Sequence, residues 1–213
     1  MSKHDTSVPE NKTRTRGRPP SIDRNAALDA AVRSFWEHGY EGASLTTLTD
    51  AMGLSRPSLY AAFGDKAELF MRAMDRYGQT IGARPLQAFQ STKSISEAVR
   101  TFLTTALDGN TLEDAPSGCL FACCATTAAE RDPAVRDQLA DVFSRTINEF
   151  RKRFEAEAAA GNLSEDPTPQ RRAELLHDLM VAQAVRARAG ASRDELLAGL
   201  DSRAAAVLTT EKK

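Results

Sequence analysis

Residues 44–66 read SLTTLTDAMGLSRPSLYAAFGDK, and this stretch decides the fold. Its apolar side chains recur at helical spacing and are Leu48, Met52, Leu54, Leu59 and Phe63. Gly53 lies where a helix that starts near Ser44 must stop, because glycine adopts a positive φ at little cost. Ser55 can cap a second helix, and Pro57 fits the first turn of that helix. The pattern predicts two short helices joined by a tight turn, a helix-turn-helix.

The second helix of this pair exposes a polar face. Leu59, Ala62 and Phe63 point inward on a helical projection, whereas the outward side chains are Arg56, Ser58, Tyr60 and Ala61. This short helix has few buried side chains to hold it in place, so its exposed polar end is expected to have a function. Binding in the major groove of DNA is the simplest such function. The alternative is a helix-turn-helix used only for packing. Lys66 at the start of the next helix and a basic segment upstream favour DNA.

Composition indicates an all-α protein. The chain has 213 residues, of which 41% are hydrophobic and 6% aromatic, and its long segments rich in Ala and Leu contain few β-branched runs. The formal net charge of −1 excludes a polycation that coats DNA but allows a local basic surface. We expect a cytoplasmic protein with no membrane partner, because no signal peptide and no segment long enough to span a bilayer is evident.

The N-terminal segment is basic. Residues 12–18 read KTRTRGR and contain no acid. We expect residues 1–21 to form a flexible arm, in which Arg16 and Arg18 add phosphate contacts or enter the minor groove. A solvated tail with no role in binding is the alternative.

Capping residues and glycines divide the remaining chain into helices. Asp23 begins the first helix, which ends at His38 and Gly39, and a capping box at Asp65 and Glu68 begins a helix to about residue 77. A weak stretch at 78–85 and a polar turn at 108–117 interrupt the pattern. Further helices are expected at 94–107, 119–130, 133–161, 170–189 and 192–208. We assign 22–68 to a helix-turn-helix DNA-binding domain of three helices and 69–213 to a helical ligand-binding (effector-binding) and dimerisation domain.

The last two expected helices are unusually apolar. Their large side chains include Leu175, Leu176, Leu179, Met180, Val185, Leu196, Leu197, Leu200, Val207 and Leu208. We expect two such hairpins to pack about a two-fold axis and form a homodimer. The alternative is that both helices fold back on their own domain.

Residues 22–75 resemble the N-terminal domain of the TetR family of one-component bacterial transcriptional regulators. The matching features are the Gly39-Tyr40-Glu41-Gly42 turn, Leu48, Gly53, Ser58-Leu59-Tyr60, Phe63, Lys66 and Leu69. Gly118-Cys119-Leu120 with Val135-Arg136 is similar to one branch of that family. The resemblance implies an Ω-like homodimer that places one recognition helix per subunit in successive major grooves of a palindromic operator, about 34–36 Å apart. It also implies a repressor that a small-molecule effector releases.

The resemblance assigns DNA contacts to particular residues. Base contacts fall on Arg56 and Pro57, and Arg56 suits a guanine edge. Phosphate contacts fall on Ser44, Thr46, Ser58, Tyr60 and Lys66. Ala61 and Ala62 are small where some family members carry bulky base-contacting side chains, so the operator sequence stays open.

Three cysteines lie within six residues. Cys119 and Cys123 share a helical face, and Cys124 adjoins them. A thiol sensor of oxidants or electrophiles, or of Cu(I), is one interpretation. We favour the structural interpretation, in which the cysteines are small buried hydrophobes. A cysteine-dependent enzyme with His177 as base is a remote alternative, and we predict no catalytic residue, no bound metal and no cofactor.

An effector cavity is expected among the helices between residues 94 and 186. Its candidate walls are Phe102, Cys119, Phe121, Cys123, Phe143, Ile147, His177 and Met180. The same side chains would also make an ordinary core, and the sequence does not separate these possibilities.

Overall fold

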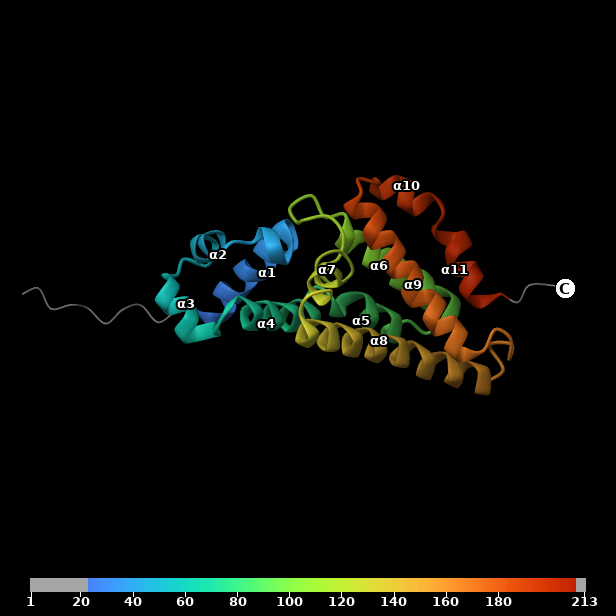
Figure 1. Ribbon diagram of the computed structural model, residues 1–213. Helices are drawn as coiled ribbons and strands as arrows, with labels where there is room; N and C mark the ends of the chain where they lie inside the picture. The colour runs from blue at the N-terminus through green and yellow to red at the C-terminus, as the bar shows by residue number, and fades with distance from the viewer. Residues whose placement is uncertain (1–22, 210–213) are drawn as a thin grey trace, which may run out of the picture.

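The computed structural model describes residues 23–209, and all regular structure in this range is helical. The all-α prediction is confirmed. Arg16 and Arg18, with the rest of the basic segment, lie outside the described residues. Figure 1 shows an elongated arrangement, in which the first three helices occupy one end and the last helices the other.

The N-terminal unit consists of α1 (Arg24–Gly42), α2 (Leu45–Met52) and α3 (Arg56–Phe63). The Asp23 carboxylate caps α1 by accepting from the backbone N–H groups of Asn25 and Ala26. Helical geometry breaks at Gly39, whose φ is 71°, and one more turn follows to Gly42. Gly53 ends α2 with a φ of 64°, in the left-handed conformation predicted from the sequence.

The next three helices are α4 (Lys66–Gln79), α5 (Ala83–Ser91) and α6 (Ile95–Asn110). The predicted capping box at Asp65 and Glu68 is present at the start of α4. Two expectations were wrong here. The weak stretch at 78–85 holds only a short turn before α5, because proline is tolerated in a first helical turn. The polar turn expected from residue 108 begins later, because α6 continues to Asn110.

The remaining chain forms a π-helical turn η1 (Phe121–Ala125), then α7 (Thr126–Ala129), α8 (Pro133–Ala159), α9 (Pro169–Arg188), α10 (Arg193–Ala198) and α11 (Leu200–Leu208). The expected helix over 119–130 is therefore partly π-helical, and the expected helix over 192–208 is divided at Gly199. Asp132 caps α8 and Thr168 caps α9 through their side-chain oxygens.

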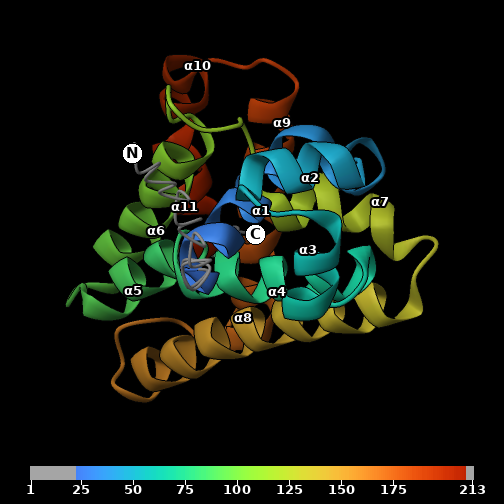
Figure 2. The same cartoon turned by 90° about the vertical axis from the view of Figure 1, so that its left-hand side faces the viewer.

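Two hydrophobic clusters form the core. The first joins α1–α4 to η1, α7 and the beginning of α8, and it includes Trp36, Phe70, Tyr77 and Leu120. The second joins α5, α6, the end of α8 and α9–α11 around Phe102 and other phenylalanines. The buried residues of α4, from Leu69 to Tyr77, belong to the first cluster. Figure 2 views the molecule from the end that carries α3.

The last two helical segments fold back on their own subunit. Leu196, Leu200 and Val207 are at most 1% exposed and belong to the second cluster. The expectation that they form an uncovered apolar face was therefore wrong for α10 and α11. On α9, by contrast, Leu175 and Val185 are 37% and 48% exposed.

Candidate functional site

The turn between α2 and α3 is fixed by short-range hydrogen bonds. The Ser44 hydroxyl accepts from the Thr47 N–H at 3.0 Å and caps α2. The Ser55 hydroxyl accepts from the Ser58 N–H at 3.3 Å and caps α3. Each cap bonds only to its own helix, so the caps do not join α2 to α3. The angle between the two helices is set instead by the backbone at Gly53 and by the buried residues that the helices share.

The α3 helix buries one face and exposes the other, as the sequence predicts. Leu59 and Phe63 are 0% and 3% exposed, whereas Tyr60 is 48% exposed. Arg56 and Pro57 are exposed at the start of the helix, and Ser58 is half-buried. The Arg56 Nη2 donates to the Thr46 Oγ1 at 2.9 Å, so the structure brings together two residues that the family resemblance assigns to DNA. This bond tethers the guanidinium above the turn.

Lys66 lies at the first position of α4. Its Nζ is 4.7 Å from the centre of the Tyr40 ring, a cation–π distance that orients the ammonium group. The Glu68 N–H at this helix end donates to the Asp65 carboxylate at 2.9 Å, and the Asp65 N–H donates to Glu68 at 3.0 Å. The capping box therefore uses two of the N–H groups at this helix terminus, those of Asp65 and Glu68. The sequence did not reveal the contact with Tyr40.

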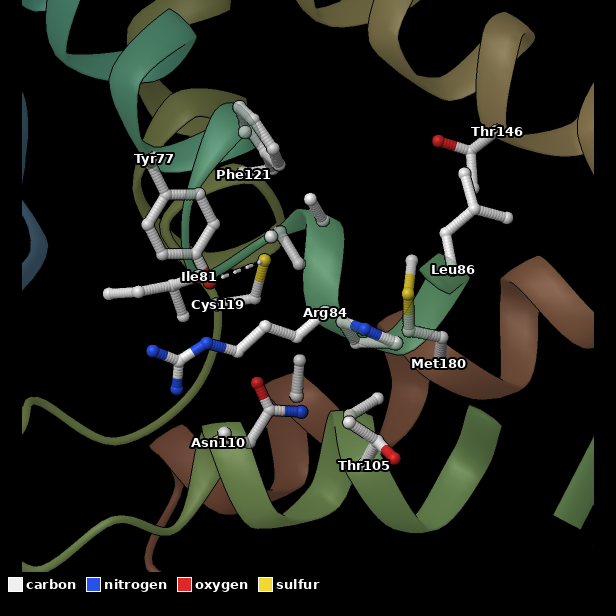
Figure 3. Close-up of a pocket in the computed structure, with 18 of the residues that line it drawn as sticks. Tyr77, Ile81, Arg84, Leu86, Thr105, Asn110, Cys119, Phe121, Thr146 and Met180 are labelled. Atoms are coloured by element: carbon white, nitrogen blue, oxygen red, sulfur yellow. Dashed lines mark hydrogen bonds between the residues drawn. The ribbon is translucent and has the colours of Figure 1, made fainter. Parts of the chain in front are cut away.

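An internal cavity of about 320 Å³ lies between the end of α4, the start of α5, and α6, η1, α8 and α9 (Figure 3). Five of the candidate wall residues line it: Phe102, Cys119, Phe121, Phe143 and Met180. Cys123, Ile147 and His177 do not. The Cys123 thiol points to the Ala184 carbonyl at 3.6 Å, Ile147 packs on the second cluster, and the His177 ring stands edge-on to Phe143.

The sequence missed the polar part of the cavity wall. Tyr77, Arg84, Thr105 and Asn110 line the cavity, and Figure 3 shows the polar ends of Tyr77, Arg84 and Asn110 on the side away from Leu86 and Met180. Tyr77 was read only as an apolar helix position, and Arg84 and Asn110 fell in stretches interpreted as interruptions. A helix assignment through 110 would have placed Thr105 and Asn110 on neighbouring turns of one helix.

A set of contacts joins the cavity to the N-terminal unit. The Tyr77 ring stands edge-on to Trp36 of α1 at a centroid distance of 5.2 Å and to Phe121 of η1 at 5.1 Å. The Trp36 indole N–H donates to the Gly118 carbonyl at 3.0 Å. Tyr77 therefore links the cavity wall directly to α1 and η1.

The three thiols have different surroundings. The Tyr77 hydroxyl donates to the Cys119 Sγ at 3.5 Å on the cavity wall. The Cys124 Sγ donates to the Trp36 carbonyl at 3.5 Å in the core. Burial raises the pKa of Cys123 and raises that of Cys124 to about 11. Since the thiolate is the reactive form, these two thiols suit packing better than sensing.

His177 is buried beside an exposed carboxylate. Its Nδ1 lies 3.8 Å from Asp178, its Nε2 has no hydrogen-bond partner among residues 23–209, and burial lowers its pKa. In this range no hydrogen bond joins it to a thiol, and no group of three or more His, Cys, Asp and Glu side chains is arranged to hold a metal ion. None of the helices in the described part of the chain is long and apolar enough to cross a membrane.

Comparison with protein families gives two matches that follow one another along the chain. A family model described as bacterial regulatory proteins of the tetR family matches residues 27–73. A model described as a tetracyclin repressor-like C-terminal domain matches residues 96–202.

Individual proteins agree with these matches. The chain is 32% identical over 188 residues to the HTH-type transcriptional repressor ComR of Escherichia coli (strain K12), covering 86% of this chain and 88% of ComR. A structure of the TetR family transcriptional regulator CifR, a cysteine mutant complexed with 26 bp double-strand operator DNA, is 35% identical with a TM-score of 0.82. That match covers 89% of this chain and 99% of the other. Reduced E. coli NemR shares the fold, with a TM-score of 0.76 at 17% identity and coverages of 89% and 98%.

Proposed function

Because this chain belongs to the TetR family of bacterial transcriptional regulators, we propose that it binds a palindromic operator as a homodimer and represses transcription until a small-molecule effector releases it. Such a protein works in the cytoplasm, where bacterial DNA lies. The observation that carries the proposal is the exposed face of α3, whose Arg56 is tethered to Thr46 of α2 beside an uncovered Tyr60.

The geometry supports a recognition role for the start of α3. Arg56 and Pro57 project from the first turn, the part of a recognition helix that meets base edges in helix-turn-helix proteins. Ser44, Thr46, Ser58 and Tyr60 offer hydroxyl groups around it, which suit phosphate oxygens. CifR, at 35% identity, was solved on operator DNA. We assign base readout to Arg56 and backbone contacts to the hydroxyls and Lys66.

We place the dimer surface on α9 with the neighbouring α8, rather than on α10 and α11. Leu175 and Val185 are the large hydrophobic side chains of α9 left exposed. α10 and α11 have their apolar residues buried in their own subunit. Two copies of an α8–α9 pair about a two-fold axis would form a four-helix interface.

The cavity supports effector control. Tyr77 lies in its wall near the C-terminal end of α4, and Lys66 lies at the other end of the same 14-residue helix, about 16 Å away along its axis. An effector that fits the cavity only when Tyr77 and α4 are displaced prefers the conformation that does not bind DNA. Such differential affinity is the requirement for coupling between two sites.

A mobility-shift titration of the full chain on the intergenic DNA upstream of its own gene tests the proposal. We expect a retarded complex whose affinity falls steeply with salt. Lys66→Ala should weaken binding to operator and random duplexes alike, because a phosphate contact does not depend on base sequence. It should also reduce the slope of log affinity against log salt concentration by about 1. Arg131→Ala, which removes an exposed arginine that pairs with Glu41, is the matched control. Absence of any preference for the upstream DNA over random sequence would contradict the proposal.

A further inference from the structure

The cavity contains a buried polar side chain without a partner. Asn110 is 5% exposed and lines the cavity, yet among residues 23–209 its carboxamide makes no hydrogen bond. Its backbone carbonyl is used, since it accepts from the Gly118 N–H at 2.8 Å. A buried amide without a partner is costly, and such groups in native proteins usually bind a water or a ligand. The Asn110 amide therefore marks a polar contact point for whatever fills the cavity.

One arginine without a carboxylate partner among residues 23–209 lies on the same wall. Arg84 is exposed at the rim, and no carboxylate pairs with it among the described residues. The other charged lining residue, Asp108, is held by Arg193, whose Nη2 and Nε lie 2.8 and 2.9 Å from one carboxylate oxygen. The cavity thus offers an available cation but no uncompensated anion.

The start of α5 forms part of the same wall. Residues Gly82, Ala83, Arg84 and Pro85 line the cavity, and no side chain caps this helix end. The Gly82 N–H donates to the Tyr77 carbonyl at 2.8 Å, the Arg84 N–H donates to the Ile81 carbonyl at 3.3 Å, and Pro85 has no N–H. Among residues 23–209 this leaves the Ala83 N–H as the one amide of the first turn that a ligand could use. Of the described helices with eight or more residues, α5 and α11 are the two whose N-terminus has no side-chain cap. Ala83 lines the same cavity as Asn110 and Arg84.

The rest of the wall is apolar and limits the size of the ligand. Phe102, Phe121, Phe143, Val142, Leu86 and Met180 supply most of it, and Figure 3 shows Leu86 and Met180 at the end away from Tyr77 and Cys119. A volume of about 320 Å³ suits a small organic molecule. Apolar walls with a few convergent polar groups are typical of sites for small organic molecules.

We propose that the effector is a compact monocarboxylic acid. Its apolar body lies against the phenylalanines, and its carboxylate accepts hydrogen bonds from Asn110 and Arg84 near the first turn of α5. The exposed position of Arg84 lets the carboxylate keep part of its hydration, which limits the cost of burying the charge. This inference deepens the function proposed above, because it names the class of molecule that would release the DNA.

Calorimetric titration of the full chain with a matched set of probes tests the inference. The set is para-isopropylbenzoate, its uncharged amide, the hydrocarbon cumene and the cationic para-isopropylbenzylamine, and the fluorescence of Trp36, the single tryptophan, gives a second readout beside Tyr77. We expect the acid to bind about tenfold or more tightly than the other three. Arg84→Gln should weaken the acid about tenfold and the amide little, because a hydrogen bond to a charged group is lost. Asn110→Leu should weaken both.

Arg145→Gln removes an exposed arginine on α8 next to the lining residue Thr146 and is the charge-matched control. Preference for the amide, cumene or the amine, an unchanged acid affinity in Arg84→Gln, or no binding of any probe at millimolar concentration would overturn the inference. DNA binding by the wild-type chain, measured without probe, separates the two proposals. DNA binding with no response to the acid removes only the ligand class, whereas acid binding without DNA binding removes only the regulator.

Discussion

Replacing Arg56 by alanine separates a role in folding from a role in reading bases. In the free protein the guanidinium donates to Thr46 Oγ1 at 2.9 Å, and both residues are exposed. The net value of such a bond is about 0.5–1 kcal/mol. The α3 helix is anchored instead by Leu59 and Phe63, which are almost fully buried. We therefore expect the free energy of unfolding to fall by no more than about 1 kcal/mol.

The loss on DNA should be larger and selective. A bidentate arginine–guanine contact contributes about 1–3 kcal/mol of discrimination, which corresponds to roughly 5- to 150-fold in affinity. Fluorescence anisotropy at one fixed salt concentration, on the operator and on a scrambled duplex of equal length, measures both affinities. Arg56→Ala should lose affinity for the operator and much less for the scrambled duplex.

A control variant should leave both affinities unchanged. Arg100→Ala is suitable, because Arg100 is an exposed arginine of α6 that pairs with Asp201. Equal losses on the two duplexes would remove Arg56 as a base reader. A loss of unfolding free energy well above 1 kcal/mol would show that the Thr46 bond holds the fold, and the reasoning from burial would then be wrong.

Three further predictions concern stability. Gly118→Ala should lower the free energy of unfolding, measured in urea, by more than about 2 kcal/mol, because φ there is +81° and the added Cβ would lie 2.9 Å from the Ala184 carbonyl oxygen. Gly109→Ala is the control: its added Cβ has no atom within 4 Å, so this variant should stabilise α6 by about 0.5–1 kcal/mol. Arg172→Met should lower the free energy of unfolding by about 2–4 kcal/mol in the same assay, because the buried guanidinium donates to the Val207 and Pro167 carbonyls at 2.8 Å. A loss as small as that of the control Arg171→Met, which changes an exposed arginine, would contradict this. Burial lowers the pKa of His177, so the unfolded chain takes up a proton on this residue at a higher pH than the folded chain. The wild type should therefore lose stability as the pH falls from about 7, through the ordinary histidine pKa of about 6.5, toward the lowered pKa of His177. His177→Leu should reduce this loss in urea titrations at several pH values. An equally steep loss in the variant would show that other groups cause it.

The sequence predicted local structure well where a side chain caps its own helix. Asp23, Ser55 and Asp65 all cap the helices that follow them, because capping depends on neighbouring residues alone. Gly53 adopts the left-handed turn for the same reason. The resemblance to the TetR family, drawn from residues 22–75, is confirmed by the family matches.

Predictions that depended on distant contacts were less successful. The apolar residues of α10 and α11 are identical in pattern whether they face a partner or their own α6, so the sequence could not show that Leu196 and Val207 are buried within the subunit. The cavity presented the same difficulty. Phenylalanines that line a cavity and phenylalanines that fill a core have the same sequence pattern. Asn110 indicates a binding site only once its burial and its lack of a hydrogen-bond partner among the described residues are known.

The central claim is that a homodimer binds one operator duplex through two copies of α3. Sedimentation of the purified chain with a duplex from its own upstream intergenic DNA measures both stoichiometry and preference. The account predicts a dimer in the absence of DNA and two chains per operator duplex, with little complex on a scrambled duplex at the same salt concentration. A chain that stays monomeric at micromolar concentration, or that sediments identically with both duplexes, would contradict it.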